Sequence, residues 1–226
     1  MHDDAEAPIP CRPAGAVVFN VARGHMLSLG VLSGNRQPGS SRIDSIFRAP
    51  KLSFAVNVPA DMVGREDLPD IVENALRLWG SPGVELVLEI TERSLIADPK
   101  RSFAILSRVR DLGVRISIDD FGTGYSCLAY FKDIPADELK IDRSFVQAMA
   151  TDAASADIAA LIIDLAHRFG LSVVAEGVED QATFELLRQR NCDAVQGHLF
   201  AKTMRLDGFT QWLHQGHAAH GVQLGR

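Results

Sequence analysis

The sequence predicts an α/β fold, a TIM-like β/α barrel. Short apolar segments alternate with helix-like stretches over most of its 226 residues, which is typical of a parallel sheet with helical crossovers. Eight strands are expected, near residues 18, 29, 54, 87, 116, 139, 173 and 195, and this number fits a closed barrel of small size. An open doubly wound sheet is the alternative, but no G-x-G-x-x-G motif follows the first strand.

The first part of the chain predicts a leader followed by a hairpin. Residues 1–15 carry three prolines and three acids, so we expect a disordered leader there, a barrel over residues 16–214 and a flexible tail over residues 215–226. Val17–Asn20 and Met26–Leu32 predict two short strands joined by a turn at residues 22–24. Asn35–Ser41 predicts a loop from its Gly, Pro and Ser content, and Ile43–Arg48 predicts one or two helical turns.

The remaining strands and helices follow from hydrophobic spacing. We expect strands at Leu52–Val56, Glu85–Ile90, Val114–Ile118, Glu138–Ile141, Leu171–Ala175 and Ala194–Val195. Apolar residues at three- and four-residue spacing predict helices at Leu68–Leu78, Ser102–Leu112, Ala156–Phe169, Gln181–Arg190 and Leu206–His214. Gly113 and Gly170 follow two of these helices as stop signals. The strands are apolar without strict alternation, as expected where both faces of a sheet are covered.

Composition narrows the class of protein. With 46% hydrophobic and 23% charged residues the chain has the composition of a soluble globular protein. A net charge of −6 argues against direct nucleic-acid binding, which needs a basic face. No apolar run reaches the ~18 residues of a membrane span, and the acidic N-terminus lacks the positive region of a secretory signal. Cys11, Cys127 and Cys192 are too far apart for a disulfide framework or a zinc site, so we expect a reduced, cytoplasmic protein.

Six of the expected strands end in polar side chains. The polar residues at these strand ends, or within three positions after them, are Asn57, Glu89, Glu92, Asp119, Asp120, Lys140, Glu176, Glu179 and Gln196. In a barrel these ends share the carboxyl-terminal rim, where active sites lie. The alternative is that each acid only caps the helix after its strand. For any single acid the two interpretations are about equal, but capping does not account for Asn, Lys and Gln in the same series.

The chemistry of these side chains favours a hard cation. Carboxylate and amide oxygens without Cys or His are typical ligands of Mg²⁺ or Mn²⁺ rather than Zn²⁺. Neighbouring carboxylates repel one another unless cations neutralise them. Two such ions would polarise a phosphodiester and activate a bridging water, and Lys140 would stabilise the charge of the transition state. For Lys140 the alternative is a buried salt bridge.

A glycine-containing loop follows the strand that ends in two aspartates. In Asp120-Phe121-Gly122-Thr123-Gly124-Tyr125-Ser126 two glycines stand two residues apart and permit positive φ angles. Such a loop moves over a ligand or carries a dimer contact. A simple tight turn between strand and helix is equally consistent with the spacing.

Five segments of the sequence together resemble the EAL-domain family. They are NVPADMV, LVLEITERSLI, SIDDFGTGYSCLAYFKDIPADELKIDRSFV, VVAEGVEDQATFELL and VQGHLF, and the resemblance runs from about Leu52 to Trp212. It implies a β/α barrel whose first strand runs antiparallel. It also implies that active members hydrolyse cyclic di-GMP to linear pGpG with Mg²⁺ or Mn²⁺.

The resemblance also implies roles for the rim residues. Asn57, Glu89, Asp119 and Glu176 match metal ligands. Asp120 matches the carboxylate beside the second metal or the water, and Lys140 matches the lysine at the attacking water, so Lys140, Glu176 and Asp120 are the catalytic candidates. Glu92 matches a glutamate that steadies the glycine-containing loop, and Glu179 and Gln196 match supporting positions.

The start of the chain departs from the family pattern. Gly24–Gly34 corresponds to the family segment G-x-I-x-G-x-E-A-L-L-R, so Gly30-Val31-Leu32 stands where the family has Glu-Ala-Leu. Gly34 stands where the family has an arginine that grips a ligand phosphate. The connection to Asn57 is short by one or two helices, which implies a shortened N-terminal lobe. Losing a metal-ligand carboxylate lowers metal affinity severely, because losses of even supporting groups cost ~10–100-fold.

Two hypotheses about function follow. The first is a degenerate, catalytically inactive member that binds cyclic di-GMP or a regulatory protein, with no metal necessarily bound. The second is a working phosphodiesterase with Mg²⁺ or Mn²⁺, in which another group replaces the missing ligand. We favour the first because a two-metal mechanism requires both ions. A homodimer through Ile134–Val146 is a further expectation that comes from the family resemblance.

Overall fold

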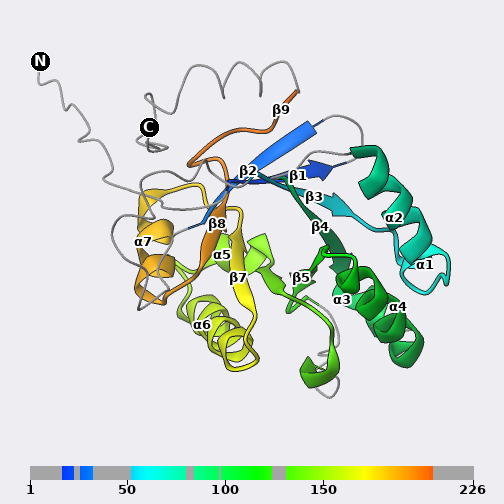
Figure 1. Cartoon of the computed structure of the whole chain (residues 1–226). Helices are drawn as coiled ribbons and strands as arrows, with labels where there is room; N and C mark the ends of the chain where they lie inside the picture. Colours follow the sequence, from blue (N-terminus) through cyan, green and yellow to red (C-terminus); the bar gives the residue numbers. More distant parts are fainter. Residues whose placement is uncertain are drawn as a thin grey trace, which may run out of the picture.

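A computed structural model describes residues 17–22, 26–32, 52–79, 84–96, 98–123 and 131–205 (Figure 1). For residues 17–22 and 26–32 it describes the backbone only. The expected leader, the loop at 35–41, the turns at 43–48, the helix at 206–214 and the tail lie outside the described residues. The shortened lobe, Gly34, and the second glycine of the loop after Asp120 lie outside them too.

Eight strands form a closed ring, which confirms the TIM-like barrel. The described part of the sheet has nine strands, and the first eight form the ring. The nine strands are β1 (Val17–Ala22), β2 (Met26–Leu32), β3 (Leu52–Asn57), β4 (Val84–Thr91), β5 (Arg115–Phe121), β6 (Glu138–Ile141), β7 (Ser172–Glu176), β8 (Ala194–Gln196) and β9 (Met204–Arg205). Their order is β1-β3-β4-β5-β6-β7-β8-β2-β9, and an additional pairing between β1 and β2 closes the ring. The short β9 extends the sheet beside β2.

Two details of the sheet differ from expectation. The antiparallel strand of the ring is the second, not the first: β1 runs parallel to β3, whereas β2 runs antiparallel to both β1 and β8. The short connection between β1 and β2 reverses the chain within a few residues, so the second strand of this hairpin opposes all the others. The sheet also has a ninth strand, because β9 has two residues and is too short to leave a periodic signal.

Helices follow most of the parallel strands. They are α1 (Ala60–Val63), α2 (Leu68–Trp79), α3 (Glu92–Ile96), α4 (Pro99–Asp111), α5 (Arg143–Ala148), α6 (Ala153–Arg168) and α7 (Gln181–Gln189), with a 3-10 helix at Phe131–Asp133. The short α1, α3 and α5 were not expected, since a helix of four to six residues shows no clear period. α4 and α6 each begin three residues before the expected start, because Asp98 and Asp152 cap them by accepting backbone N–H groups of the first turn.

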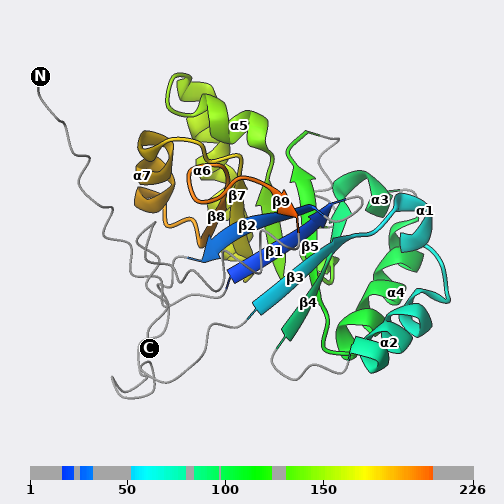
Figure 2. The same cartoon turned by 90° about the horizontal axis from the view of Figure 1, so that it is seen from above.

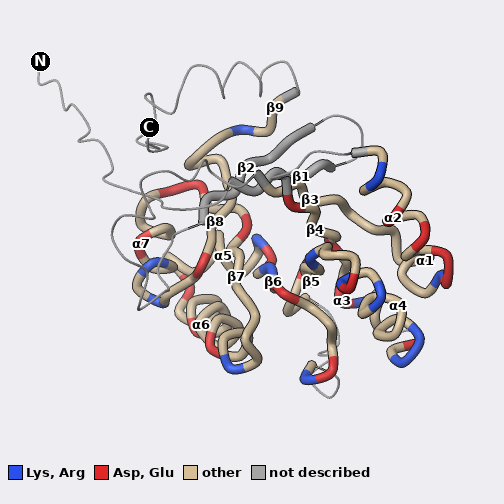
Figure 3. The backbone as a smooth tube through the Cα atoms, viewed as in Figure 1, with Lys and Arg blue, Asp and Glu red and all other residues tan. Residues whose placement is uncertain are grey.

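The helices lie outside the ring in two groups (Figures 1 and 2). α1 to α4 lie beside β3 and β4, and α5 to α7 lie beside β7 and β8. Charged positions of both signs are spread along the outer helices (Figure 3). Within the described parts of the chain, no helix is long and apolar enough to cross a membrane.

The two faces of the barrel sheet have different chemistry. In β4 the buried Leu86, Leu88 and Ile90 belong to the large apolar cluster between the sheet and the helices. The alternate positions are Glu85, Val87 and Glu89, and Val87 packs with Ala55 of β3 in a separate small cluster. Side chains two apart on a strand share a face, so the second set faces the inside of the barrel. β4 therefore alternates, contrary to expectation, and the barrel interior is polar above and below a thin apolar layer.

Candidate functional site

The buried Lys140 of β6 lies at the centre of a cluster of three acids at the carboxyl-terminal rim. Its side chain is 2% exposed, and Nζ lies 2.8 Å from Glu89 Oε1, 3.1 Å from Asp119 Oδ1 and 2.5 Å from Glu176 Oε1. The three acids come from β4, β5 and β7. The expected convergence of strand-end side chains is thus present for these four residues, and the buried ion pairs considered for Lys140 are present as well.

Two acids of this cluster, Glu89 and Glu176, resist ionisation. Burial raises the pKa of Glu89 to about 7, and repulsion from Asp119 and Glu176 adds to the effect, although Lys140 opposes it. Burial also raises the pKa of Glu176, with Lys140 opposing and Asp119 adding to the rise. For Lys140, burial disfavours the charge, but Glu176, Glu89 and Asp119 outweigh it and hold the pKa above its ordinary value. One ammonium group therefore serves three carboxylates, which leaves an excess of negative charge at the rim.

A β-bulge brings two consecutive aspartates to the rim. The register between β5 and β6 shifts between Ile118 and Phe121, and Asp120 has φ +55°. Consecutive residues of a regular strand point to opposite faces, and an extra residue in a bulge re-aims a side chain. The Asp120 N–H donates to Asp119 Oδ1 at 3.0 Å. Partial burial raises the pKa of Asp120, and the charges of Asp119 and Asp142 raise it further.

Three further expected residues lie on the same rim. Asn57 ends β3 in register with Glu89, Gln196 ends β8 in register with Glu176, and the buried Glu92 begins α3 directly after β4. Their assigned roles remain predictions.

Glu179 lies in the loop after β7, and its side chain is exposed. Its Oε1 accepts a hydrogen bond from Gln147 Nε2 of α5 at 3.0 Å and lies 3.9 Å from His198 Nδ1. Glu179 is thus part of a polar contact between rim loops, and none of its described ion pairs involves Lys140.

The position of Gly30 is defined by its backbone pairing. Gly30 of β2 lies opposite Gln196 of β8, which in turn lies opposite Glu176 of β7. Residues directly opposite one another in a sheet lie on the same face, and the Glu176 side chain contacts Lys140 inside the barrel. Position 30 therefore faces the interior beside Gln196, and a glycine there contributes no side-chain oxygen.

The oxygen ligands of the rim suit a divalent cation, but in this structure they surround the ammonium group of Lys140. Carboxylate oxygens from three strands are the ligands that Mg²⁺ and Mn²⁺ prefer. The point at which they meet, however, is taken by Lys140 Nζ. Among the described residues, no group of three or more His, Cys, Asp or Glu side chains is arranged to hold a metal ion. In this arrangement the carboxylates pair with the ammonium group.

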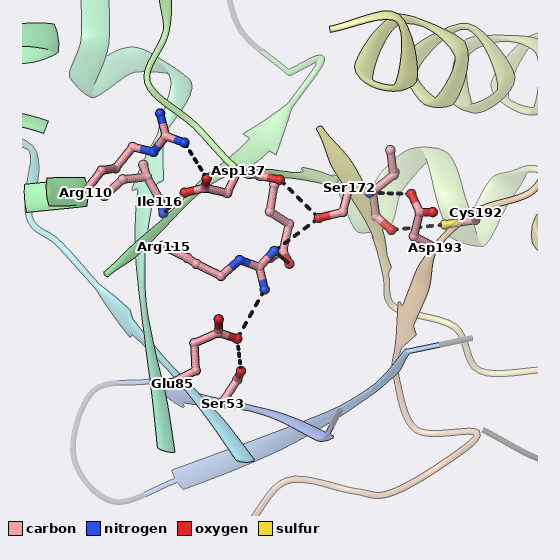
Figure 4. Close-up of polar contacts among 11 residues, drawn as sticks. Ser53, Glu85, Arg110, Arg115, Ile116, Asp137, Ser172, Cys192 and Asp193 are labelled. Atoms are coloured by element: carbon pink, nitrogen blue, oxygen red, sulfur yellow. Dashed lines mark hydrogen bonds and ion pairs between the residues drawn. The ribbon is translucent and has the colours of Figure 1, made fainter. Parts of the chain in front are cut away.

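A second polar layer, not expected from the sequence, lies at the opposite end of the barrel (Figure 4). We call Ser53, Glu85, Arg115, Glu138 and Ser172 the floor layer. Arg115 Nη2 lies 3.2 Å from both Glu138 Oε2 and Ser172 Oγ, and Nη1 lies 3.5 Å from Glu85 Oε2. The Ser53 hydroxyl donates to Glu85 at 2.8 Å.

A signal for the floor layer was present in the sequence. Four of its members precede a rim residue of the same strand by four positions, namely Ser53 and Asn57, Glu85 and Glu89, Arg115 and Asp119, and Ser172 and Glu176. Residues four apart on a strand share a face. Polar residues at both ends of one face therefore indicate two polar layers inside the barrel.

Comparison with known proteins identifies the family. The model of the EAL domain matches residues 40–203. The chain belongs to the EAL domain family. This match begins after Gly30-Val31-Leu32, so the replacement of the Glu-Ala-Leu motif stays a prediction.

Several relatives are similar over part of their length. The cyclic di-GMP phosphodiesterase NbdA of Pseudomonas aeruginosa is 42% identical over 163 residues, which are 72% of this chain and 21% of the relative. The oxygen sensor protein DosP of Escherichia coli is 32% identical over 215 residues, which are 94% of this chain and 26% of the relative. The chain thus spans about a fifth to a quarter of the length of these two relatives.

Solved structures of EAL domains are also similar. The PaMucR phosphodiesterase in complex with c-di-GMP has 41% sequence identity and a TM-score of 0.65, and the match covers 70% of this chain and 64% of that one. The EAL domain of Mycobacterium smegmatis DcpA has 34% identity and a TM-score of 0.67, and the match covers 73% of this chain and 74% of that one.

Proposed function

We propose that this chain is a degenerate EAL domain that acts in cyclic di-GMP signalling by binding the nucleotide without hydrolysing it. The observation that carries the proposal is the glycine at position 30, on the inner face of β2 beside Gln196 and Glu176. The family resemblance places a metal-ligand glutamate at this position. Without it, the rim acids have the Lys140 ammonium as partner but lack one anionic ligand of the proposed metal site.

The choice of ligand is supported by the relatives. NbdA is named as a cyclic di-GMP phosphodiesterase, and the PaMucR structure contains c-di-GMP. A bound Mg²⁺ or Mn²⁺ would be held by Asn57, Glu89, Asp119, Asp120 and Glu176, and it would offset the negative charge of the rim toward an anionic nucleotide. We therefore expect cyclic di-GMP to bind more tightly when Mn²⁺ is present.

A second candidate function is an active phosphodiesterase. It is favoured by the convergence of Glu89, Asp119 and Glu176 on Lys140. In that case a side chain outside the predicted set replaces the glutamate missing at position 30.

The test combines binding and turnover on the full chain. Calorimetry with cyclic di-GMP, with and without Mn²⁺, measures affinity, and chromatography measures the formation of pGpG. We expect binding without turnover. The double variant Gly30→Glu with Gly34→Arg restores the family side chains and is expected to gain turnover. Gly64→Ala is the control, because the added methyl group meets no atom within 4 Å.

Each outcome decides between the candidates. Wild-type turnover that Glu176→Ala abolishes would establish the active phosphodiesterase. Neither binding nor turnover in the wild type would overturn the proposal and leave docking of a regulatory protein as the remaining function of the domain.

A further inference from the structure

Two rim loops, after β7 and after β8, meet in a backbone contact that none of the roles above uses. The Val178 N–H donates to the Gln196 carbonyl at 3.0 Å, and the Leu199 N–H donates to the Val178 carbonyl at 3.1 Å. The Val178 side chain is completely buried. We call these two hydrogen bonds, with Val178 and Gly197, the rim clasp.

The rim clasp requires glycine at position 197. A Cβ atom there would lie 2.0 Å from the Val178 carbonyl oxygen and 2.4 Å from the Val178 nitrogen. Both neighbours are backbone atoms, so they cannot rotate away as the end of a side chain does. Any other residue at position 197 therefore forces the two loops apart.

A second glycine joins the same loop to α5. Gly177 has φ +73°, and a Cβ atom there would lie 2.7 Å from Arg143 Cβ. The Gln147 side chain of α5 also binds Glu179 of this loop. Because α5 follows directly on β6, which carries Lys140, these contacts connect the ends of β6, β7 and β8.

We propose that Gly177 and Gly197 are positioning residues that hold Glu176 and Gln196 as one unit against Lys140. Gly177 directly follows Glu176, and Gly197 directly follows Gln196. The Glu176 carboxylate lies 2.5 Å from Lys140 Nζ, and a displacement of about 1 Å in a supporting group is enough to impair a site. Separation of the loops therefore moves Glu176 away from the ammonium group.

The chain offers a matched control for the left-handed backbone strain of the Gly177 substitution. Gly170 has φ +76°, nearly the same as Gly177, but a Cβ atom there meets nothing within 4 Å. It follows α6 at the opposite end of β7. Gly170→Ala thus carries the cost of a left-handed alanine without crowding and without contact to the rim.

The test compares Gly177→Ala, Gly197→Ala and Gly170→Ala in the full chain. The first measurement is the ¹H–¹⁵N signal of the Lys140 ammonium group, which reports its ion pairs and needs no ligand. The second is the affinity for cyclic di-GMP with Mn²⁺, which rests on the proposed function. The third is urea unfolding, which measures stability.

We expect Gly177→Ala and Gly197→Ala to shift the Lys140 signal and to weaken nucleotide binding by about tenfold or more, as for other supporting groups. Gly170→Ala is expected to lose stability while the signal and the affinity stay the same. An unchanged Lys140 signal in the two rim variants would overturn the inference. A shifted signal in a protein whose wild type binds no nucleotide would support it and would overturn the proposed function alone.

A milder variant keeps the test decisive if Gly197→Ala does not fold. Val178→Ala shortens the buried side chain of the clasp without crowding position 197. We expect a smaller shift of the Lys140 signal in the same direction, and an unchanged signal would again count against the clasp.

Discussion

The two ends of the barrel interior handle buried charge in different ways. At the rim, one ammonium group lies between three carboxylates. In the floor layer, the guanidinium of Arg115 lies between Glu85 and Glu138, and serine hydroxyls bind Glu85 and Arg115 as well. A guanidinium offers five donors in a fixed fork, whereas an ammonium group is a compact point charge. The floor thus has one carboxylate more than it has cations, whereas the rim has two more.

This difference separates a structural layer from a candidate site. A layer whose charged groups are also hydrogen-bonded by hydroxyls holds neighbouring strands in register. At the rim the pKa values of Glu89 and Glu176 are raised, and groups with raised pKa values concentrate at functional sites. The larger excess of negative charge at the rim favours a cationic partner there.

The largest expected effect comes from removing the rim cation. In Lys140→Met the buried Glu89 and the partly buried Asp119 and Glu176 lose their shared cation, so the free energy of unfolding should fall by about 3–5 kcal/mol at pH 8. Urea unfolding measures the change. The exposed Lys132 offers a control, and Lys132→Met should stay within about 0.5 kcal/mol of the wild type. If Lys140→Met were as stable as the wild type, the inference that the rim carboxylates depend on this cation would be wrong.

The pH dependence of stability gives the next effect. The folded protein raises the pKa of Glu89 from 4.5 to about 7, so the folded state holds this proton more tightly than the unfolded state. The resulting stabilisation is fully present below pH 4.5 and is lost as pH rises through 7, up to about 3 kcal/mol. Glu176 and Asp120 shift in the same direction.

The Glu89→Gln variant checks the origin of this pH dependence. It carries no titrating group at position 89, so its unfolding free energy should fall less than that of the wild type between pH 5 and pH 8. Urea midpoints at one-unit intervals measure the two profiles. Parallel profiles would assign the pH dependence to other groups.

The smallest expected effect comes from the floor. Arg115→Met leaves Glu85 and Glu138 without their cation, and because Arg115 is 25% exposed the loss of stability should be about 2 kcal/mol. Affinity for cyclic di-GMP should stay within about twofold, since the floor lies at the end of the barrel opposite the proposed binding site. The exposed Arg77, paired with Glu73, provides the control variant Arg77→Met. A loss of affinity of about tenfold or more would show that the floor also positions the rim.

Sequence patterns predicted most strands of the barrel and the polar residues of its rim, but not the floor layer. The apolar runs located β3 to β8 to within a few residues, because a strand buried by helices must present apolar side chains to them. The shorter elements depend on tertiary contacts, because β9 with two residues and α5 with six are too short to show a periodic pattern. The early starts of α4 and α6 were predictable, since Asp98 and Asp152 are typical capping residues.

The sequence by itself determined which chemical groups end the strands, because the apolar runs locate the strand ends and the residues at those positions are known. Only the tertiary structure decided that Lys140 Nζ lies between Glu89, Asp119 and Glu176, since that position depends on how neighbouring strands are registered. The bulge that re-aims Asp120 and the pairing that sets Gly30 beside Gln196 have the same origin. Contacts between strands arise from ring closure, which no local pattern of residues encodes.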